Sequence, residues 1–243
     1  MKRYPRNFNK LIHKSNEVGT INGLWANTMG KGGIIPIQTL YFPSSAFLDL
    51  KLTGLQGDVM KESMNVAKTL AWNLTNKSIK TKLLKYFTDT KCQGLHIHCP
   101  EGSISKDGPS AGAAITTAIY SLFNNISLPN DVAITGEITL KGDVNAIGGL
   151  YEKISGGIKA GITTFIIPKQ NERDYNEVIE KYQNKNIDIN YFFNQNNNLF
   201  NINFYQSDGN TEYDSFGSNL NQDHKDSHIK LAWNRNYKES ESN

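Results

Sequence analysis

A serine stands at the start of a predicted apolar helix, where it could act as a nucleophile. The stretch Pro100–Ala114 leaves an apolar segment, crosses a polar turn and delivers Ser110 to the first turn of a helix predicted over Ser110–Tyr120. Backbone N–H groups at a helix N-terminus lack intrahelical acceptors and favour negative charge. A serine hydroxyl is a weak nucleophile by itself, so the rest of the chain must supply a base.

Two histidines that precede the serine are the first candidates for that base. His96 and His98 lie in a strand predicted over Gly94–Cys99, and the two-residue period of a strand places both side chains on one face. With Asp107 and Ser110, one of the two would complete a Ser-His-Asp triad. They would equally serve as packing and hydrogen-bonding residues of the strand.

Zinc binding is a third interpretation of the same residues. His96, His98 and Cys99 are close in sequence, but Cys99 points to the opposite face of the strand. No other His or Cys lies at the usual spacing of zinc ligands. The sequence therefore predicts no metal and no cofactor.

A lysine is the other candidate base, because Ser-Lys dyads are an established variant of the triad. A lysine acts as a base only when its pKa falls well below its free value of about 10.4, which burial achieves by disfavouring the ammonium. Lys153 lies in the apolar segment 147–154, on the first turns of a helix predicted over Leu150–Ala160. That helix N-terminus also disfavours a positive charge. Lys159 is expected on the solvated face of the same helix.

Helices alternate with short strands along the chain, which predicts an α/β or α+β domain. Asp58 is placed to cap the helix that follows it, and Pro36 favours a sheet edge for its strand. The predicted strands are 17–26, 33–41, 46–53, 94–99, 131–135, 163–167 and 187–193, with two more short strands inside 136–147. The predicted helices are 59–74, 78–87, 110–120, 150–160 and 171–185.

Composition limits the classes of function. The 243 residues carry a net charge of +3, too weak and too evenly spread to indicate a nucleic-acid partner. Since no apolar stretch approaches 18 residues, no membrane span is predicted. Cys92 and Cys99 are read as reduced thiols of a cytoplasmic, reducing compartment.

The two ends differ in composition from the centre. Residues 1–15 form a basic lead-in without the apolar core of a secretory signal. Residues 194–243 are rich in Asn, Asp, Ser and Lys, and are predicted to be a loosely ordered tail. The stretch 192–204, where the tail begins, and the stretch 229–233 inside it are apolar enough to dock locally. The folded domain is therefore expected over 16–193.

Several motifs, in this order, resemble the proteolytic domain of the Lon protease family. Ser105–Gly112 reads Ser-Lys-Asp-Gly-Pro-Ser-Ala-Gly and resembles the signature around that family's catalytic serine. Thr135–Gly142 resembles its central motif, and Ile147–Lys153 resembles the segment that carries its catalytic lysine. The resemblance covers roughly residues 16–192, and the separation of the serine from the lysine also matches.

The resemblance implies a ribosomal protein S5 domain 2-like fold, with short mixed sheets and packed helices. It implies a serine endopeptidase that cleaves polypeptides, with Ser110 as nucleophile and Lys153 as base and later acid. Backbone N–H groups around the serine would hold the oxyanion. Such domains usually assemble as six-membered rings. The residues implied to support the dyad are Thr135, as a hydrogen-bond partner of the lysine, His96, His98 and Asp107 near the site, and Gly108 and Gly112 for close approach.

The chain departs from the family at the ATPase module that normally precedes the proteolytic domain. No phosphate-loop motif is present, because Met29-Gly30-Lys31-Gly32 lacks the leading glycine and the hydroxyl after the lysine. We therefore expect ATP-independent cleavage of flexible segments, unless a separate ATPase docks on the domain. Two alternatives stay open: a catalytically silent binding or assembly module with the same fold, and a phosphate- or nucleotide-binding protein that uses the Gly-rich turns.

Overall fold

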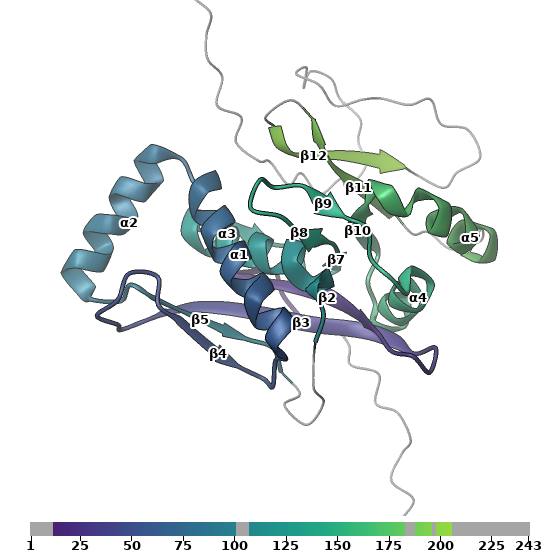
Figure 1. Ribbon diagram of the computed structural model, residues 1–243, viewed down its shortest axis with the longest axis horizontal. Helices are drawn as coiled ribbons and strands as arrows, with labels where there is room; N and C mark the ends of the chain where they lie inside the picture. The colour runs from purple at the N-terminus through teal and green to yellow at the C-terminus, as the bar shows by residue number, and fades with distance from the viewer. Residues whose placement is uncertain (1–11, 101–106, 183–187, 196–197, 206–243) are drawn as a thin grey trace, which may run out of the picture.

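The computed structural model describes residues 12–100, 107–182, 188–195 and 198–205 (Figure 1). Its strands are β1 (Glu17–Val18), β2 (Thr20–Ala26), β3 (Gly32–Phe42), β4 (Leu50–Thr53), β5 (Gly94–His98), β6 (Ser127–Leu128), β7 (Val132–Ile134), β8 (Glu137–Ile138), β9 (Val144–Asn145), β10 (Thr164–Pro168), β11 (Asp188–Gln195) and β12 (Asn198–Tyr205). Its helices are α1 (Asp58–Leu74), α2 (Lys77–Thr90), α3 (Gly112–Asn124), α4 (Leu150–Ala160) and α5 (Glu172–Tyr182), with 3-10 turns η1 (Pro109–Ala111) and η2 (Lys169–Asn171).

The main sheet has eight strands in the order β12-β11-β10-β7-β2-β3-β5-β4. Strands β2, β7, β10 and β11 are parallel to one another, and β3 and β12 run against their neighbours. Because β5 is antiparallel to β3 and parallel to β4, six strands point the same way. Their carboxyl ends share one edge of the sheet, which we call the carboxyl edge. Open α/β sheets bind their ligands at such an edge.

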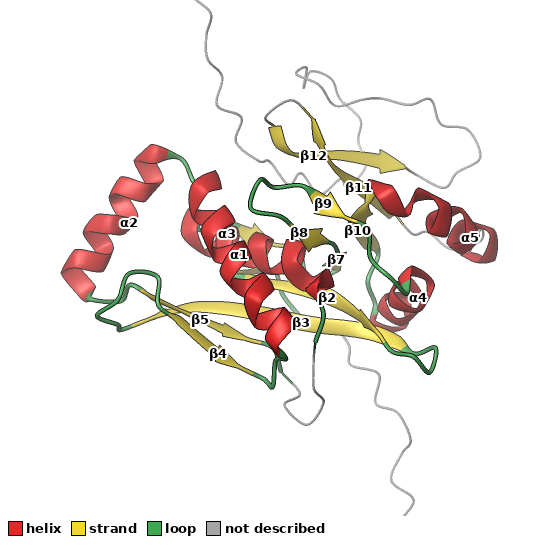
Figure 2. Cartoon of the chain, in the orientation of Figure 1, coloured by secondary structure: helices red, strands yellow, loops and turns green. Residues whose placement is uncertain are grey.

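Helices pack on both faces of the part of this sheet formed by β2, β3, β7 and β10, which makes three layers there (Figure 2). Alternate residues of β3 face opposite ways, so Ile35 and Ile37 join the core beneath α1 and α3, whereas Ile34 joins the core beneath α4 and α5. Helix α3 is almost entirely buried, since α1 covers it from outside and β2, β3 and β7 lie beneath it. The mixed α/β fold predicted from the sequence is confirmed.

Pro36 does not lie on an edge strand, and that prediction is wrong. Strand β3 pairs with β2 on one side and with β5 on the other. The β5 pairing begins only at Gln38, so at Pro36 the strand has a ladder partner on one side only. A proline lacks the N–H needed for a second ladder, and this local gap accommodates it.

Two further segments differ from their predictions. The strand predicted over 46–53 begins at Leu50, because Leu48 has a φ of 49°, which extended backbone does not allow. Strand β12 lies inside the predicted tail, overlaps the apolar stretch 192–204 and pairs with β11. The apolar stretch 229–233 lies outside the described residues. The boundaries at 15 and 193 remain predictions.

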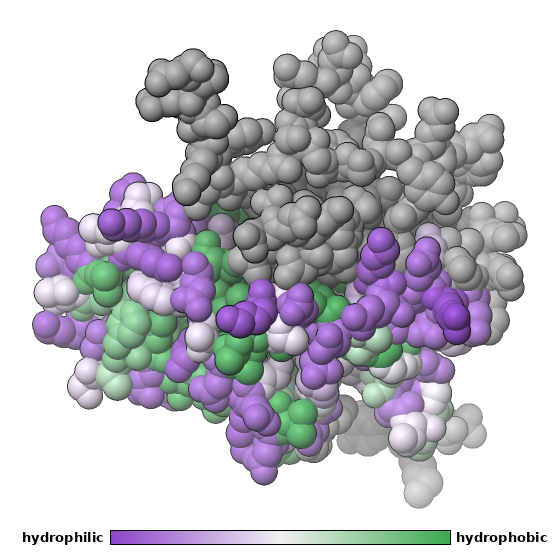
Figure 3. Space-filling view, turned by 45° about the horizontal axis from the view of Figure 1, so that its top comes forward, coloured by the Kyte–Doolittle hydropathy of each residue, from purple (hydrophilic) through white to green (hydrophobic). Residues whose placement is uncertain are grey.

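The surface mixes polar and apolar side chains. Figure 3 shows green apolar patches interrupted by purple hydrophilic side chains on one face of the molecule. Within the described ranges, no helix is both long enough and apolar enough to cross a membrane. Among the residues whose side chains are described, the exposed large apolar ones are Met29, Leu40, Phe47, Leu55, Val59, Leu84, Tyr86, Leu140 and Tyr151.

Candidate active site

Ser110 lies on the 3-10 turn η1, just before α3, and the predicted α-helix therefore begins two residues late. The Ser110 carbonyl accepts hydrogen bonds from the Gly136 N–H at 2.8 Å and from the Thr135 hydroxyl at 3.1 Å. Both donors directly follow β7, at the carboxyl edge. Because this carbonyl is bound by the end of β7, the regular α-helical ladder starts only after Ser110.

Gly112 brings α3 into close contact with two neighbouring elements. A Cβ added there would lie 2.8 Å from the Ser63 hydroxyl of α1 and 2.8 Å from a methyl of Ile138 in β8. A side chain would therefore push the segment that carries the serine away from α1 and β8. Gly108 is required for a different reason: its φ is 125°, although its surroundings are open.

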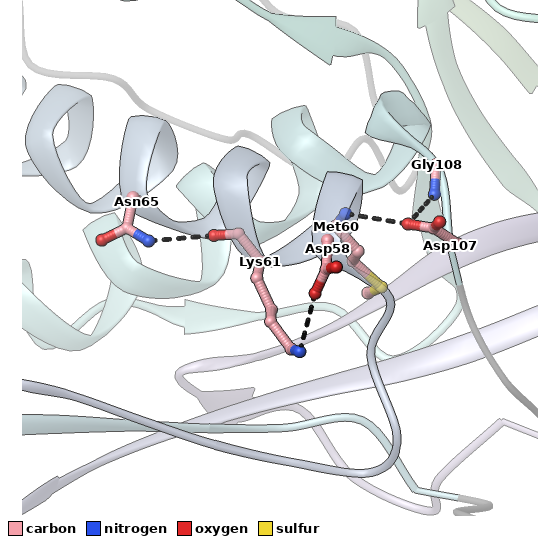
Figure 4. A network of polar contacts seen from close by, with 6 residues as sticks. All are labelled: Asp58, Met60, Lys61, Asn65, Asp107 and Gly108. Atoms are coloured by element: carbon pink, nitrogen blue, oxygen red, sulfur yellow. Dashed lines mark hydrogen bonds and ion pairs between the residues drawn. The ribbon is translucent and has the colours of Figure 1, made fainter.

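Asp107 caps α1 from the loop that leads to the serine (Figure 4). One carboxylate oxygen accepts from the backbone N–H of Met60 at 3.1 Å and from that of Gly108 at 3.0 Å. The predicted cap, Asp58, instead forms an exposed ion pair with Lys61 at 3.0 Å. The Asp58 prediction is wrong because the N-cap position belongs to Gly57, on which the Asp107 carboxyl packs.

Lys153 is a buried lysine on the first turns of α4. Only 4% of the residue is exposed, and its Nζ donates a hydrogen bond to the Gly148 carbonyl oxygen at 2.9 Å. Burial lowers its pKa from 10.5 to about 8, since desolvation penalises the ammonium. Among the described residues no carboxylate pairs with it. A neutral amine can still donate to Gly148 while its lone pair accepts a proton.

The serine and the lysine approach the same strand from different layers. The turn η1, which carries Ser110, and the helix α4, which carries Lys153, both pack on β2. The two side chains are not hydrogen-bonded to each other in this structure. Nor is Thr135 bonded to the lysine as expected; its hydroxyl holds the Ser110 carbonyl. Catalytic hydrogen bonds are often long without substrate and tighten when it binds.

His96 and His98 are both bound to Thr53 of β4. Both rings hydrogen-bond the Thr53 hydroxyl, at 2.9 and 2.7 Å. Burial, then Lys51 and His98, lower the pKa of His96. Asp107 uses its oxygen on Met60 and Gly108, so the hydrogen bonds of a Ser-His-Asp triad are not formed. Within the described ranges, no three His, Cys, Asp or Glu side chains gather as a metal site.

Three residues of this site were not singled out from the sequence. Gly136 donates to the Ser110 carbonyl, and a Cβ on it would lie 2.4 Å from a methyl of Val144. Ser63 touches the start of α3, and the Gly148 carbonyl holds Lys153. Gly136 sits in the Thr-Gly-Glu part of the central motif, which was a usable signal. The other two contacts depend on residues distant in sequence or on a backbone atom.

Comparison with known proteins agrees with this geometry. Residues 3–202 match the family model described as the Lon protease (S16) C-terminal proteolytic domain. A Lon protease homolog of Acanthamoeba polyphaga mimivirus is 46% identical over 176 residues, which cover 70% of this chain and 16% of that protein. The Lon protease of Clostridium acetobutylicum is 40% identical over 174 residues, 72% of this chain and 21% of that protein.

A mitochondrial Lon protease homolog of Candida albicans is 41% identical over 174 residues, which cover 69% of this chain and 15% of that protein. The chain thus spans about a fifth or less of the length of these relatives. The family model covers most of the chain, and its segments that carry the serine, the threonine and the buried lysine all fall within the match. The chain belongs to the Lon protease (S16) C-terminal proteolytic domain family, a family of serine peptidase domains.

Proposed function

We propose that this chain is a serine endopeptidase in which Ser110 is the nucleophile and Lys153 is the base. The observation that carries the proposal is the burial of Lys153. The residue is 4% exposed, has no carboxylate partner among the described residues and has a pKa of about 8. A solvated lysine would be almost fully protonated near neutral pH, whereas a pKa of about 8 leaves a usable neutral fraction. Family membership and the shared packing of η1 and α4 on β2 support the pairing.

The proposed reaction proceeds through an acyl-enzyme. The neutral amine of Lys153 takes the hydroxyl proton of Ser110 while the serine oxygen bonds to the carbonyl carbon of the scissile peptide. The resulting ammonium then protonates the leaving nitrogen as the C–N bond breaks. A water molecule, deprotonated by the same amine, then attacks the ester carbonyl, the bond to the serine oxygen breaks, and the ammonium returns its proton to that oxygen as the second product leaves as a carboxylic acid. Backbone N–H groups at the start of η1 would stabilise the oxyanion in both halves.

Thr135, Gly136, Asp107 and Gly112 would position the nucleophile rather than react. Two of them hold the Ser110 carbonyl, and the other two tie its segment to α1. A nucleophile held from its backbone keeps its hydroxyl free for proton transfer. Gly108 would allow the loop to turn before the serine. His96 and His98 would support the site indirectly, because their hydrogen bonds to Thr53 join β5 to β4.

The substrates would be peptides and flexible protein segments, cleaved without ATP. The 243 residues contain no phosphate-loop motif, which supports ATP independence of the chain as it stands. We further propose a homohexameric ring and a reducing, cytoplasmic location, in keeping with Cys92 and Cys99, which form no disulfide with each other. A separate ATPase that feeds the ring would extend its substrates to folded proteins.

The experiment compares cleavage of casein and of a fluorogenic peptide by wild type, Ser110→Ala, Lys153→Met and Lys159→Met, each with and without ATP. We expect wild type and Lys159→Met to cleave equally, with no effect of ATP, and the two dyad variants to lose activity by at least about 10³-fold. Light scattering of the same samples measures the oligomer. Ser110→Ala cleaving like wild type would contradict the dyad, and an inactive wild-type hexamer would favour the silent assembly module.

A further inference from the structure

Helix α4 rests on the start of β3 through a direct contact between two glycines. A Cβ added to Gly156 would lie 2.1 Å from the carbonyl carbon of Gly32 and 2.3 Å from the nitrogen of Gly33. A Cβ added to Gly32 would lie 2.0 Å from the Glu152 oxygen and 2.9 Å from the Lys153 nitrogen. Real Cβ atoms essentially never approach other atoms within 3.0 Å. Either side chain would therefore separate the helix from the strand.

The atoms in this contact belong to the backbone, which cannot move aside as a flexible side chain would. Gly157, the next residue, differs, because a Cβ there would first meet the ring of Phe165. The contact also includes the peptide unit between Glu152 and Lys153 itself. The N-cap of α4 is Gly149, whose left-handed backbone, with a φ of 67°, fixes where the helix begins. Because Gly32 contacts the backbone of Lys153 itself, this contact determines how deeply the lysine is buried.

We propose that Gly32 and Gly156 are positioning residues for the lysine: their backbone contact seats α4 on β3 and so holds Lys153 in its buried site. The inference rests on the proposed function, in which Lys153 is the base. Neither glycine touches the reacting atoms, so both would act through the placement of the helix.

Burial lowers the pKa of Lys153, so this pKa should depend on how closely α4 packs on β3. Strands β2 and β3, which pack against the helix, carry no Asp, Glu, Lys, Arg or His. The charged residues of α4 and α5 whose side chains are described are Glu152, Lys159, Glu172, Arg173, Asp174 and Glu177. None of these described charges is a cause of the lowered pKa of Lys153, which desolvation by burial lowers. A helix raised from the strand would admit water and bring that pKa back toward 10.5.

The test compares Gly156→Ala and Gly32→Ala with Gly30→Ala. Gly30 lies in the β2–β3 turn with a φ of 70° and open space around it, so alanine there strains the backbone without pushing α4. Two readouts are needed for each variant. Competitive acetylation of Lys153 with acetic anhydride from pH 6 to 11, read by mass spectrometry, reports its titration without any enzyme activity. The acidic limb of the pH–rate profile for peptide cleavage reports the pKa of the catalytic base.

We expect both contact variants to raise the Lys153 pKa by about one unit or more, which lowers the neutral fraction near pH 7 about tenfold per unit. The acidic limb of the rate profile should move by the same amount. Gly30→Ala should lose thermal stability but keep the wild-type titration and rate profile. A folded Gly156→Ala protein with the wild-type titration would overturn the inference. If neither contact variant folds, the glycines serve the whole fold and the inference fails.

The two proposals fail in different ways. If acetylation shows the shift while the rate profile stays in place, Lys153 is not the base, and the proposed function fails while the positioning stands. If the wild type cleaves and its rate profile follows Lys153, but the contact variants titrate like wild type, only the glycine inference fails.

Discussion

The carboxylate of Asp107 accepts a hydrogen bond at 3.1 Å from the backbone N–H of Met60, 47 residues earlier in the chain. The first turn of α1 is therefore capped by a residue three positions before the nucleophile. Because the same oxygen accepts from Gly108, the cap also fixes the loop that leads to Ser110. Stability of the helix and position of the serine are coupled through one side chain.

Asp107→Ala should lower the free energy of unfolding by about 1 kcal/mol, the usual value of an N-cap. Asp107→Asn keeps an acceptor oxygen and should lose much less. Asp58→Ala removes an exposed ion pair, worth about 0–1 kcal/mol, but no side-chain cap, and is the matched control. Urea denaturation of the three variants at one pH measures the order. A larger loss in Asp58→Ala than in Asp107→Ala would show that the cap is assigned to the wrong residue.

Lys153→Met should stabilise the protein below about pH 8, although it removes the proposed base. The lysine pKa is about 8 in the folded chain and near 10.5 when unfolded, so between these values the unfolded chain binds more protons. The free energy of unfolding of wild type therefore rises with pH across this window and is flat below it. The gain from methionine should reach about 3 kcal/mol at pH 7 and shrink toward pH 10.5.

Thermal or urea unfolding from pH 6.5 to 10.5 measures this difference. Lys159→Met, on the exposed face of the same helix, is the control and should leave the pH dependence as in wild type. If the free energy of unfolding of wild type falls between pH 8 and 10, the folded protein stabilises the charged form of the lysine, which contradicts the prediction.

Thr135→Val should slow the proposed peptidase several-fold with a stability loss of about 1 kcal/mol. The hydroxyl donates to the Ser110 carbonyl, and valine preserves the shape while removing the donor. Thr117→Val is the matched control, because that buried hydroxyl also donates to a backbone carbonyl, of Ala113, inside α3. Equal stability losses with an activity loss only in Thr135→Val would confirm the positioning role. Equal activities would refute it.

His96 should make the protein less stable in mild acid. Burial, Lys51 and His98 lower its pKa below 6.5, so on acidification the unfolded chain takes up a proton before the folded chain does. The free energy of unfolding then falls as pH drops through 6.5. His96→Gln should flatten that dependence, as measured by urea unfolding from pH 5 to 7.5. A dependence as steep as in wild type would assign it to other groups.

The two residues of the proposed dyad and the protein family can both be predicted from the sequence. Ser110 and Lys153 were named from residue type, predicted helix starts and motif order, because these signals are local. The alternation of helices and strands likewise predicted the α/β class. The Asp58 cap and the Pro36 edge were wrong, since a local pattern shows where a cap or an edge is permitted and not which distant residue supplies it.

Residue type and local order establish which side chains are available: a serine before a helix, a lysine in an apolar segment and the glycines around them. Their burial and their hydrogen bonds follow from how the layers pack. The lysine is buried because α4 sits on the glycines of β3, and the serine leaves the helix ladder because the end of β7 binds its carbonyl. Asp107 serves α1 rather than a histidine. Each of these results joins residues far apart in the chain, and such pairings are set by packing of the layers, which no local pattern encodes.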